Sequence, residues 1–261
     1  MDMANKVNMD IFIPAFIFSV LSAENFALAR YTHLAIGGFI IVLGSGLLLW
    51  PLCRWLKLEP KTFLPPMMYN NCGNLGLPLA LLAFGEAALP AAVVLFLVSN
   101  TLHFTVGIYS LNQSANPLNI LKMPIVLVTI FGLLWSYMSW PVYPAIDTAI
   151  DMLGQIAIPL MLFTLGIRMT EVSFTHWRIS IIGALLCPLA SLIIAAGVIW
   201  LLPIPEEQQA YLLLFSVLPP AVLNFIVAER FKQQPEQVAA IVLIGNIASL
   251  GIIPLVLWFI L

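Results

Sequence analysis

The sequence of 261 residues is 62% hydrophobic and only 8% charged, and its mean hydropathy is +1.04. Because soluble globular domains carry roughly a quarter charged residues, this composition excludes a soluble fold and predicts an integral membrane protein. The formal net charge of −2 carries little information, and no basic segment indicates a nucleic-acid partner.

Nine apolar runs predict nine transmembrane helices, so the expected fold class is all-α and multi-pass. In chain order these runs cover residues 11–23, 31–56, 63–84, 87–110, 122–142, 146–169, 178–202, 208–229 and 236–260.

The third and the eighth of these helices contain residues that break a helix in the middle of the membrane. The third carries Asn70, Asn71, Gly73, Asn74 and Pro78, and the eighth carries Pro219, Pro220 and Asn224. Proline removes a backbone donor, and free backbone groups at membrane depth are tolerated only inside protein or beside a watery cavity. We therefore predict that these eight residues form a substrate site.

Two broken helices can bind an anion without a lysine or arginine, because a helix N-terminus presents unpaired N–H groups and a partial positive charge. The alternative is that the prolines and glycines only kink the helices and that the asparagines join neighbouring helices. The occurrence of two such segments at matching places favours a shared site.

Four other polar residues within the predicted helices are secondary candidates for this site: Asn100, Asn246, His103 and Gln155. The two asparagines could equally form hydrogen bonds between helices. His103 could take part in proton movement, although a lone histidine in a helix is more often a packed residue. Gln155 lies one turn beyond Asp151 and could reach the cavity.

The basic residues predict the orientation in a plasma (inner) membrane. If the nine helices alternate in direction, one side of the membrane collects Lys6, Arg54, Lys57, Lys61, Lys122, Arg168, Arg178, Arg230 and Lys232, and the other keeps only Arg30. Since cytoplasmic loops are rich in lysine and arginine, we expect a cytoplasmic N-terminus and a non-cytoplasmic C-terminus.

An internal repeat divides the sequence into two halves, residues 1–116 and 117–261. The segment around Pro14 matches the segment around Pro159 at a separation of 145 residues, with four of ten positions identical. Because five helices separate the two copies, they must be inverted relative to each other, as in many secondary transporters. The second half begins with a helix, 122–142, that the first half lacks. We expect either a truncated ten-helix protein, which we favour, or the loss of a peripheral helix.

The sequence resembles the auxin efflux carrier family in its short bacterial form of malate or malonate permeases. The resemblance rests on the run from Asn71 to Ala80, on Phe84 to Glu86, on Ile158 to Gly166 and on the Pro219-Pro220 pair. It implies ten helices in two inverted repeats, with two broken helices that cross, similar to the bile-acid/sodium symporter fold. Pro78 and Pro219 or Pro220 would then lie at the crossing, with the neighbouring asparagines facing the substrate.

These features predict a secondary transporter for small organic anions such as carboxylates, which alternates access around the crossing. A channel, a sensor or receptor on a transporter fold, and an inactive truncated carrier are the alternatives. The motifs of intramembrane enzymes are missing from the sequence, so we expect no enzyme activity and no cofactor. The expected partners are the anion and the lipid bilayer. A homodimer is an alternative to a monomer that the sequence leaves open.

Overall fold

The computed structural model describes residues 2–23, 26–112, 121–169 and 176–261. Helices occupy each of the nine predicted ranges, and the all-helical membrane fold is confirmed. Five helices are long and apolar enough to cross a membrane: Leu28–Trp55, Glu86–Leu111, Pro144–Ile167, Trp177–Leu201 and Pro235–Ile260.

The first helix begins earlier than the sequence predicts, because its polar N-terminal residues are helical too. It consists of α1 (Asp2–Val7), a π-helical turn η1 (Asn8–Phe12) and α2 (Ile13–Ser22). Pro14 cannot donate to the preceding turn, which is the turn that widens. Its counterpart Pro159 follows a similar irregularity, between α9 (Pro144–Gln155) and α10 (Ala157–Met169).

The fifth helix, α8 (Pro124–Tyr137), ends earlier than the predicted residue 142. Ser139 adopts a left-handed backbone conformation, with φ of 50°, and Pro141 follows two residues later. Both features stop a right-handed helix, so the remaining apolar residues form a connection.

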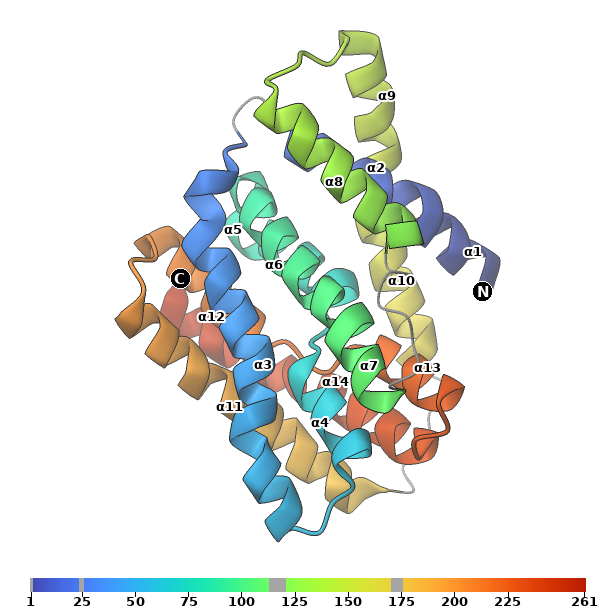
Figure 1. The fold of residues 1–261 in the computed structure, drawn as a ribbon, viewed down its shortest axis with the longest axis vertical. Coiled ribbons are helices and arrows are strands. Elements are labelled where there is room, and N and C mark those ends of the chain that lie inside the picture. The colour runs from blue at the N-terminus through green and yellow to red at the C-terminus, as the bar shows by residue number, and fades with distance from the viewer. Residues whose placement is uncertain (1, 24–25, 113–120, 170–175) are drawn as a thin grey trace.

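The helices form two bundles (Figure 1). In the smaller bundle α2 packs against α8 and α9. The larger bundle contains α3 (Thr32–Trp55), α6 (Leu89–Leu102), η5 (His103–Gly107), α7 (Ile108–Leu111), α11 (Trp177–Leu201) and α14 (Pro235–Ile260), together with the two broken helices. Each bundle takes helices from both halves of the sequence. The predicted boundary between residues 116 and 117 lies outside the described residues.

The pairing of α3 with α11 fits an inverted repeat. A Cβ atom on Gly37 would lie 3.0 Å from a methyl group of Val198, and one on Gly44 would lie 3.0 Å from Ile194. Further along, the hydroxyl groups of Ser45 and Ser191 are 3.2 Å apart. Residue numbers rise along α3 as they fall along α11, so these corresponding helices of the two halves run antiparallel.

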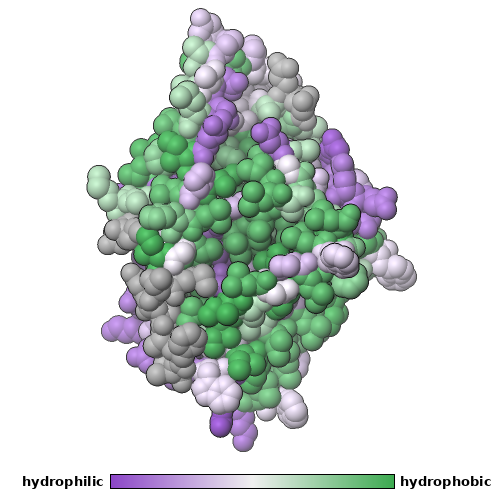
Figure 2. Space-filling view, turned by 180° about the vertical axis from the view of Figure 1, so that it is seen from behind, coloured by the Kyte–Doolittle hydropathy of each residue, from purple (hydrophilic) through white to green (hydrophobic). Residues whose placement is uncertain are grey.

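The outer surface suits a lipid environment. Figure 2 shows a face that is mostly hydrophobic across its middle, with hydrophilic residues in a stripe down its upper part and along its edges. In Figure 1 the starts of α4 and α11, which carry Lys61 and Arg178, lie at the same lower end of the molecule. This clustering agrees with the charge partition, and the direction of insertion remains a prediction.

Gly154 provides a test of the smaller bundle, because α9 touches the backbone of α2 there. A Cβ atom on Gly154 would lie 2.9 Å from Phe16 Cα and 3.0 Å from Phe16 N. Since backbone cannot move aside easily, we expect Gly154→Ala to destabilise the protein by about 1–3 kcal/mol, measured as thermal unfolding in detergent. The control is Gly166→Ala, because a Cβ atom there meets nothing within 4 Å. Equal stability of the two variants would contradict this packing.

Candidate functional site

The two broken helices meet at their breaks. The first consists of α4 (Pro60–Met68), the π-helical turn η3 (Cys72–Gly76) and α5 (Leu77–Phe84), and the second of α12 (Glu206–Ser216) and α13 (Leu223–Arg230). Asn70 and Pro220 form an antiparallel bridge between the extended segments. Two backbone hydrogen bonds flank it, from Asn71 N–H to Pro219 C=O (2.7 Å) and from Ala221 N–H to Tyr69 C=O (2.9 Å). We call residues 69–71 and 217–222 the crossing.

Proline chemistry explains the break in the second helix. Pro219 has no N–H to donate to the carbonyl of Phe215, one turn earlier in α12. The side-chain amide of Asn70 donates to that carbonyl instead, at 2.9 Å. The side chain of one broken helix thus replaces the backbone donor that the other lacks.

Pro78 lies beyond the extended segment of the first broken helix, and its part in a substrate site remains a prediction. It lies in the first turn of α5, after the π-helical turn η3. The chain is already helical from Cys72, and, as at Pro14, the turn before the proline, which cannot receive its N–H, is π-helical. The break occurs earlier in the chain, at Tyr69 to Asn71.

The buried asparagines in and beside the crossing use their amide N–H groups mainly on its backbone carbonyls. Asn224 Nδ2 donates to Tyr69 O (2.9 Å) and to Ala221 O (3.0 Å). Asn246 Nδ2 donates to Pro220 O (3.1 Å), and Asn71 Nδ2 lies 3.5 Å from Asn246 Oδ1. In this conformation these side chains hold the crossing together. Their contact with a substrate remains a prediction.

Asn74 and Asn100 differ from these asparagines. Both are half-buried, and within the described part of the chain neither side chain makes a hydrogen bond. Asn74 and Gly73 belong to η3, which packs against α6 and α10. A Cβ atom on Gly73 would lie 3.0 Å from the Phe96 ring, so this glycine permits a close approach of η3 to α6.

A small polar cavity lies on the side of the crossing where α4 and α13 are. Its volume is about 10 Å³, and it is lined by Lys61, Thr62, Pro65, Pro66, His103, Gly107, Leu111, Asn224, Val227, Ala228 and Val238. Three of the lining residues each have one buried side-chain atom without a hydrogen-bond partner among the described residues: Thr62 Oγ1, His103 Nε2 and Asn224 Oδ1. Lys61 is exposed and marks the solvent edge of the cavity. We call this space the polar cavity.

His103 connects the polar cavity to the crossing. Its ring stacks on that of Tyr69, with centroids 4.2 Å apart and planes inclined by 5°. Gly107 makes room for this stack, since a Cβ atom there would lie 2.9 Å from the Tyr69 ring and 3.1 Å from His103. Tyr69 is itself part of the crossing, so His103 is one contact away from it.

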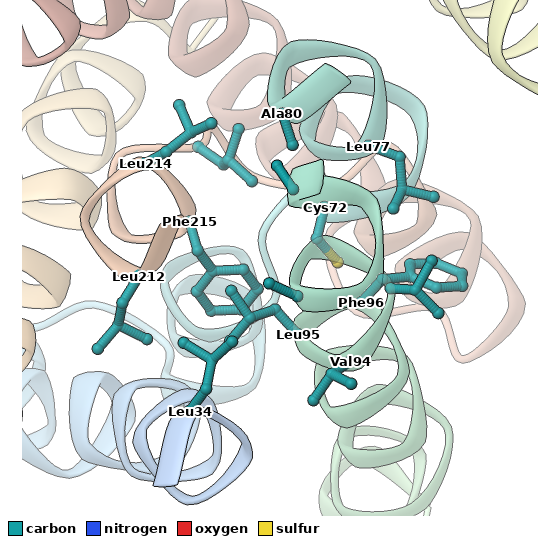
Figure 3. Close-up of a cluster of buried hydrophobic side chains, with 14 of the residues drawn as sticks. Leu34, Cys72, Leu77, Ala80, Val94, Leu95, Phe96, Leu212, Leu214 and Phe215 are labelled. Atoms are coloured by element: carbon teal, nitrogen blue, oxygen red, sulfur yellow. The ribbon is translucent and has the colours of Figure 1, made fainter. Parts of the chain in front are cut away.

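An apolar cavity lies on the side of α5 and α12. Its volume is about 20 Å³, and it is lined by Cys72, Gly76, Ala80, Ala92, Leu95, Tyr211, Leu214, Phe215 and Leu218. Figure 3 shows Cys72, Leu95 and Phe215 converging between α12 and α6. The two sides of the crossing therefore differ in polarity.

Gln155 lines neither of these two cavities but a wider, open one of about 530 Å³, together with Met152, Ile156, Pro159, Leu160 and Phe163. It is exposed at the end of α9, where its amide donates to Asp151 at 2.7 Å, and Ser19 lies 3.3 Å from the same carboxylate. Its role in a substrate site remains a prediction.

Sequence reasoning did not single out Thr62, Lys61 or Tyr69. Lys61 and Thr62 lie just before the predicted start of the third helix at residue 63, and Tyr69 lies in its break, and nothing in the local sequence indicates that α4 borders on α13. Only the proximity of Tyr69 to the Asn70-Asn71 pair could have drawn notice to it.

Comparison with known proteins gives two matches. The family described as "Membrane transport protein" matches residues 108–258, more than half of the chain, including the second broken helix. A protein of Rhizobium meliloti (strain 1021), described as "Putative malonate transporter", is 28% identical over 214 residues. That match covers 74% of this chain and 64% of the relative, so the chain spans less than two thirds of the relative's length.

Proposed function

Because the chain belongs to the membrane transport protein family, that of the auxin efflux carriers, we propose that it is a secondary transporter for small organic anions of the carboxylate class. The observation that carries this proposal is the antiparallel crossing of two broken helices, one from each half of the sequence. Irregular backbone of this kind at membrane depth is found where it is enclosed by protein or lines a transport site.

The substrate class follows from the groups around the crossing and from the relative. Asparagine amides and backbone N–H groups can bind a carboxylate, and the segments of the crossing contain no lysine or arginine. The similar protein from Rhizobium meliloti is named for malonate, which supports a dicarboxylate as the first candidate.

The two bundles support an alternating-access cycle. In this proposal the smaller bundle, built on α2, α8 and α9, and the larger bundle rock against each other around the crossing. The π-helical turn η3 packs against α10, so a motion between these elements would change access to Asn74.

Asn74 gives the sharpest test of a binding role. Its side chain makes no hydrogen bond in the described structure, so Asn74→Ala removes a free amide at little structural cost. We expect uptake of labelled malonate into reconstituted vesicles to fall about tenfold or more, mainly through a higher KM, since a hydrogen bond to a charged group contributes about 1.5–3 kcal/mol.

The control is Thr148→Ala, because that exposed hydroxyl bonds only to its own helix, at Pro144 O. Acetate, succinate and malonate should be compared in the same vesicles. Saturable uptake that is unchanged in Asn74→Ala would remove Asn74 from the site, and the absence of saturable carboxylate uptake by the unmodified protein would refute the proposed function.

A further inference from the structure

The polar cavity contains polar atoms that the crossing does not use. Asn224, a residue of the cavity wall, uses its side-chain amide on the carbonyls of Tyr69 and Ala221, which leaves its Oδ1 buried without a partner. Thr62 Oγ1 and His103 Nε2 are the other two unpartnered atoms, and all three residues are at least 96% buried, with exposures of 1%, 4% and 3% for Thr62, His103 and Asn224. A buried polar atom without a partner reduces the stability of the fold. Such atoms are therefore uncommon, and those that occur are often found at functional positions.

The chemistry of these atoms indicates the ligand. An amide oxygen accepts hydrogen bonds, a hydroxyl group accepts or donates, and an imidazole nitrogen can bind a proton. A carboxylate needs donors and would be repelled by the Asn224 oxygen. The volume of about 10 Å³ suits a single water molecule, and Lys61 lies at the solvent edge of the same cavity.

We propose that the polar cavity is a proton site: His103 Nε2 takes up a proton from solvent when a carboxylate binds at the neighbouring crossing, and the two are carried together. This inference rests on the proposed carrier function. The proton bonds to the lone pair of Nε2 in the tautomer that keeps its hydrogen on Nδ1. The negative charge of the bound carboxylate then balances the imidazolium.

The surroundings of His103 make the anion its main source of negative charge. Among the described residues, the charged or titratable groups that face it are Tyr69, whose ring it stacks on, and Lys61 at the edge of the cavity. Glu229 of α13 and Glu236 of α14 are exposed and do not line the cavity. A buried positive charge without a partner is unfavourable, so proton and anion each favour the binding of the other.

Proton uptake on substrate binding tests this coupling. Malonate is added to the purified protein in a weak buffer containing a pH indicator, at pH values where malonate is fully ionised. We expect uptake of up to one proton per bound malonate, and an affinity that tightens up to about tenfold for each unit that pH falls. In His103→Gln both effects should be lost. His33→Gln is the matched control, because His33 is exposed on α3, and it should behave as the unmodified protein.

Malonate binding without proton uptake, or equal proton uptake by His103→Gln, would overturn the inference and leave the proposed function intact. Binding that requires sodium in place of protons would overturn it as well. If no carboxylate binds, the proposed function fails together with the inference. If His103→Gln does not fold, nitrogen NMR of the histidine-labelled protein tests the inference instead. The chain has three histidines, so an imidazole signal that malonate shifts in the unmodified protein, in His33→Gln and in His176→Gln belongs to His103. The absence of such a signal would overturn the inference.

Discussion

Replacing Asn246 by leucine should lower transport at least about tenfold and reduce stability by about 1–3 kcal/mol, the cost of leaving a buried carbonyl without its donor. Asn246 Nδ2 donates to Pro220 O at 3.1 Å and to Val242 O at 2.8 Å, so it ties α14 to the crossing. Leucine keeps the branching of the side chain at Cγ but has no donor. Thermal unfolding in detergent and vesicle uptake of malonate measure the two effects.

Asn100→Leu is the control for stability, because Asn100 is the counterpart of Asn246 in the first half of the sequence. It is half-buried, and its side chain makes no hydrogen bond in the described structure. We therefore expect Asn100→Leu to keep the unfolding temperature of the unmodified protein. If both variants lose the same stability, the hydrogen bonds of Asn246 do not hold the crossing.

The double substitution Pro219→Ala with Pro220→Ala should abolish most transport while leaving the protein folded. Both new residues can donate to the preceding turn, so α12 can continue through the crossing. The Pro219 carbonyl would then turn away from Asn71 N–H, and Asn70 would compete with the backbone for Phe215 O. We expect uptake to fall about tenfold or more, with little change in unfolding temperature.

Pro254→Ala is the matched control for this double variant. Pro254 lies within α14, which stays helical from Pro235 to Ile260, and its side chain is exposed. Transport should be retained in that variant. Normal transport by the Pro219/Pro220 double variant would show that the break itself is dispensable.

The breaks in the third and eighth helices were predictable because they depend on local chemistry. A missing N–H at Pro219 disrupts a helix wherever the helix lies, and the sequence places the break there correctly. Pro78 does not interrupt the helix in the same way, because the π-helical turn before it accommodates the missing N–H, and the sequence does not reveal which response a proline will produce. The polar N-terminal residues were assigned outside the first helix for a related reason: composition alone does not mark its start.

The partners of the polar residues were not predictable, because they come from distant parts of the chain. Asn70 bonds to Phe215, and Asn224 bonds to Tyr69, across 145 and 155 residues respectively. The repeat pairs Asn100 with Asn246 in sequence, yet only Asn246 reaches a carbonyl of the crossing. Likewise, the cavity formed by Thr62, His103 and Asn224 depends on how three separate helices pack.

The contact between Ser45 and Ser191 bears on the balance between the two end states of the proposed cycle. These residues are 146 residues apart, the same separation as Asn100 and Asn246, and their hydroxyl groups are 3.2 Å apart. Equivalent residues of two inverted copies can touch each other only close to the pseudo-twofold axis. Exchanging the conformations of the halves converts an inward-facing state into an outward-facing one and leaves such a contact unchanged. In the proposed cycle the serine pair would therefore contribute equally to both populations, as a contact that persists while the access changes.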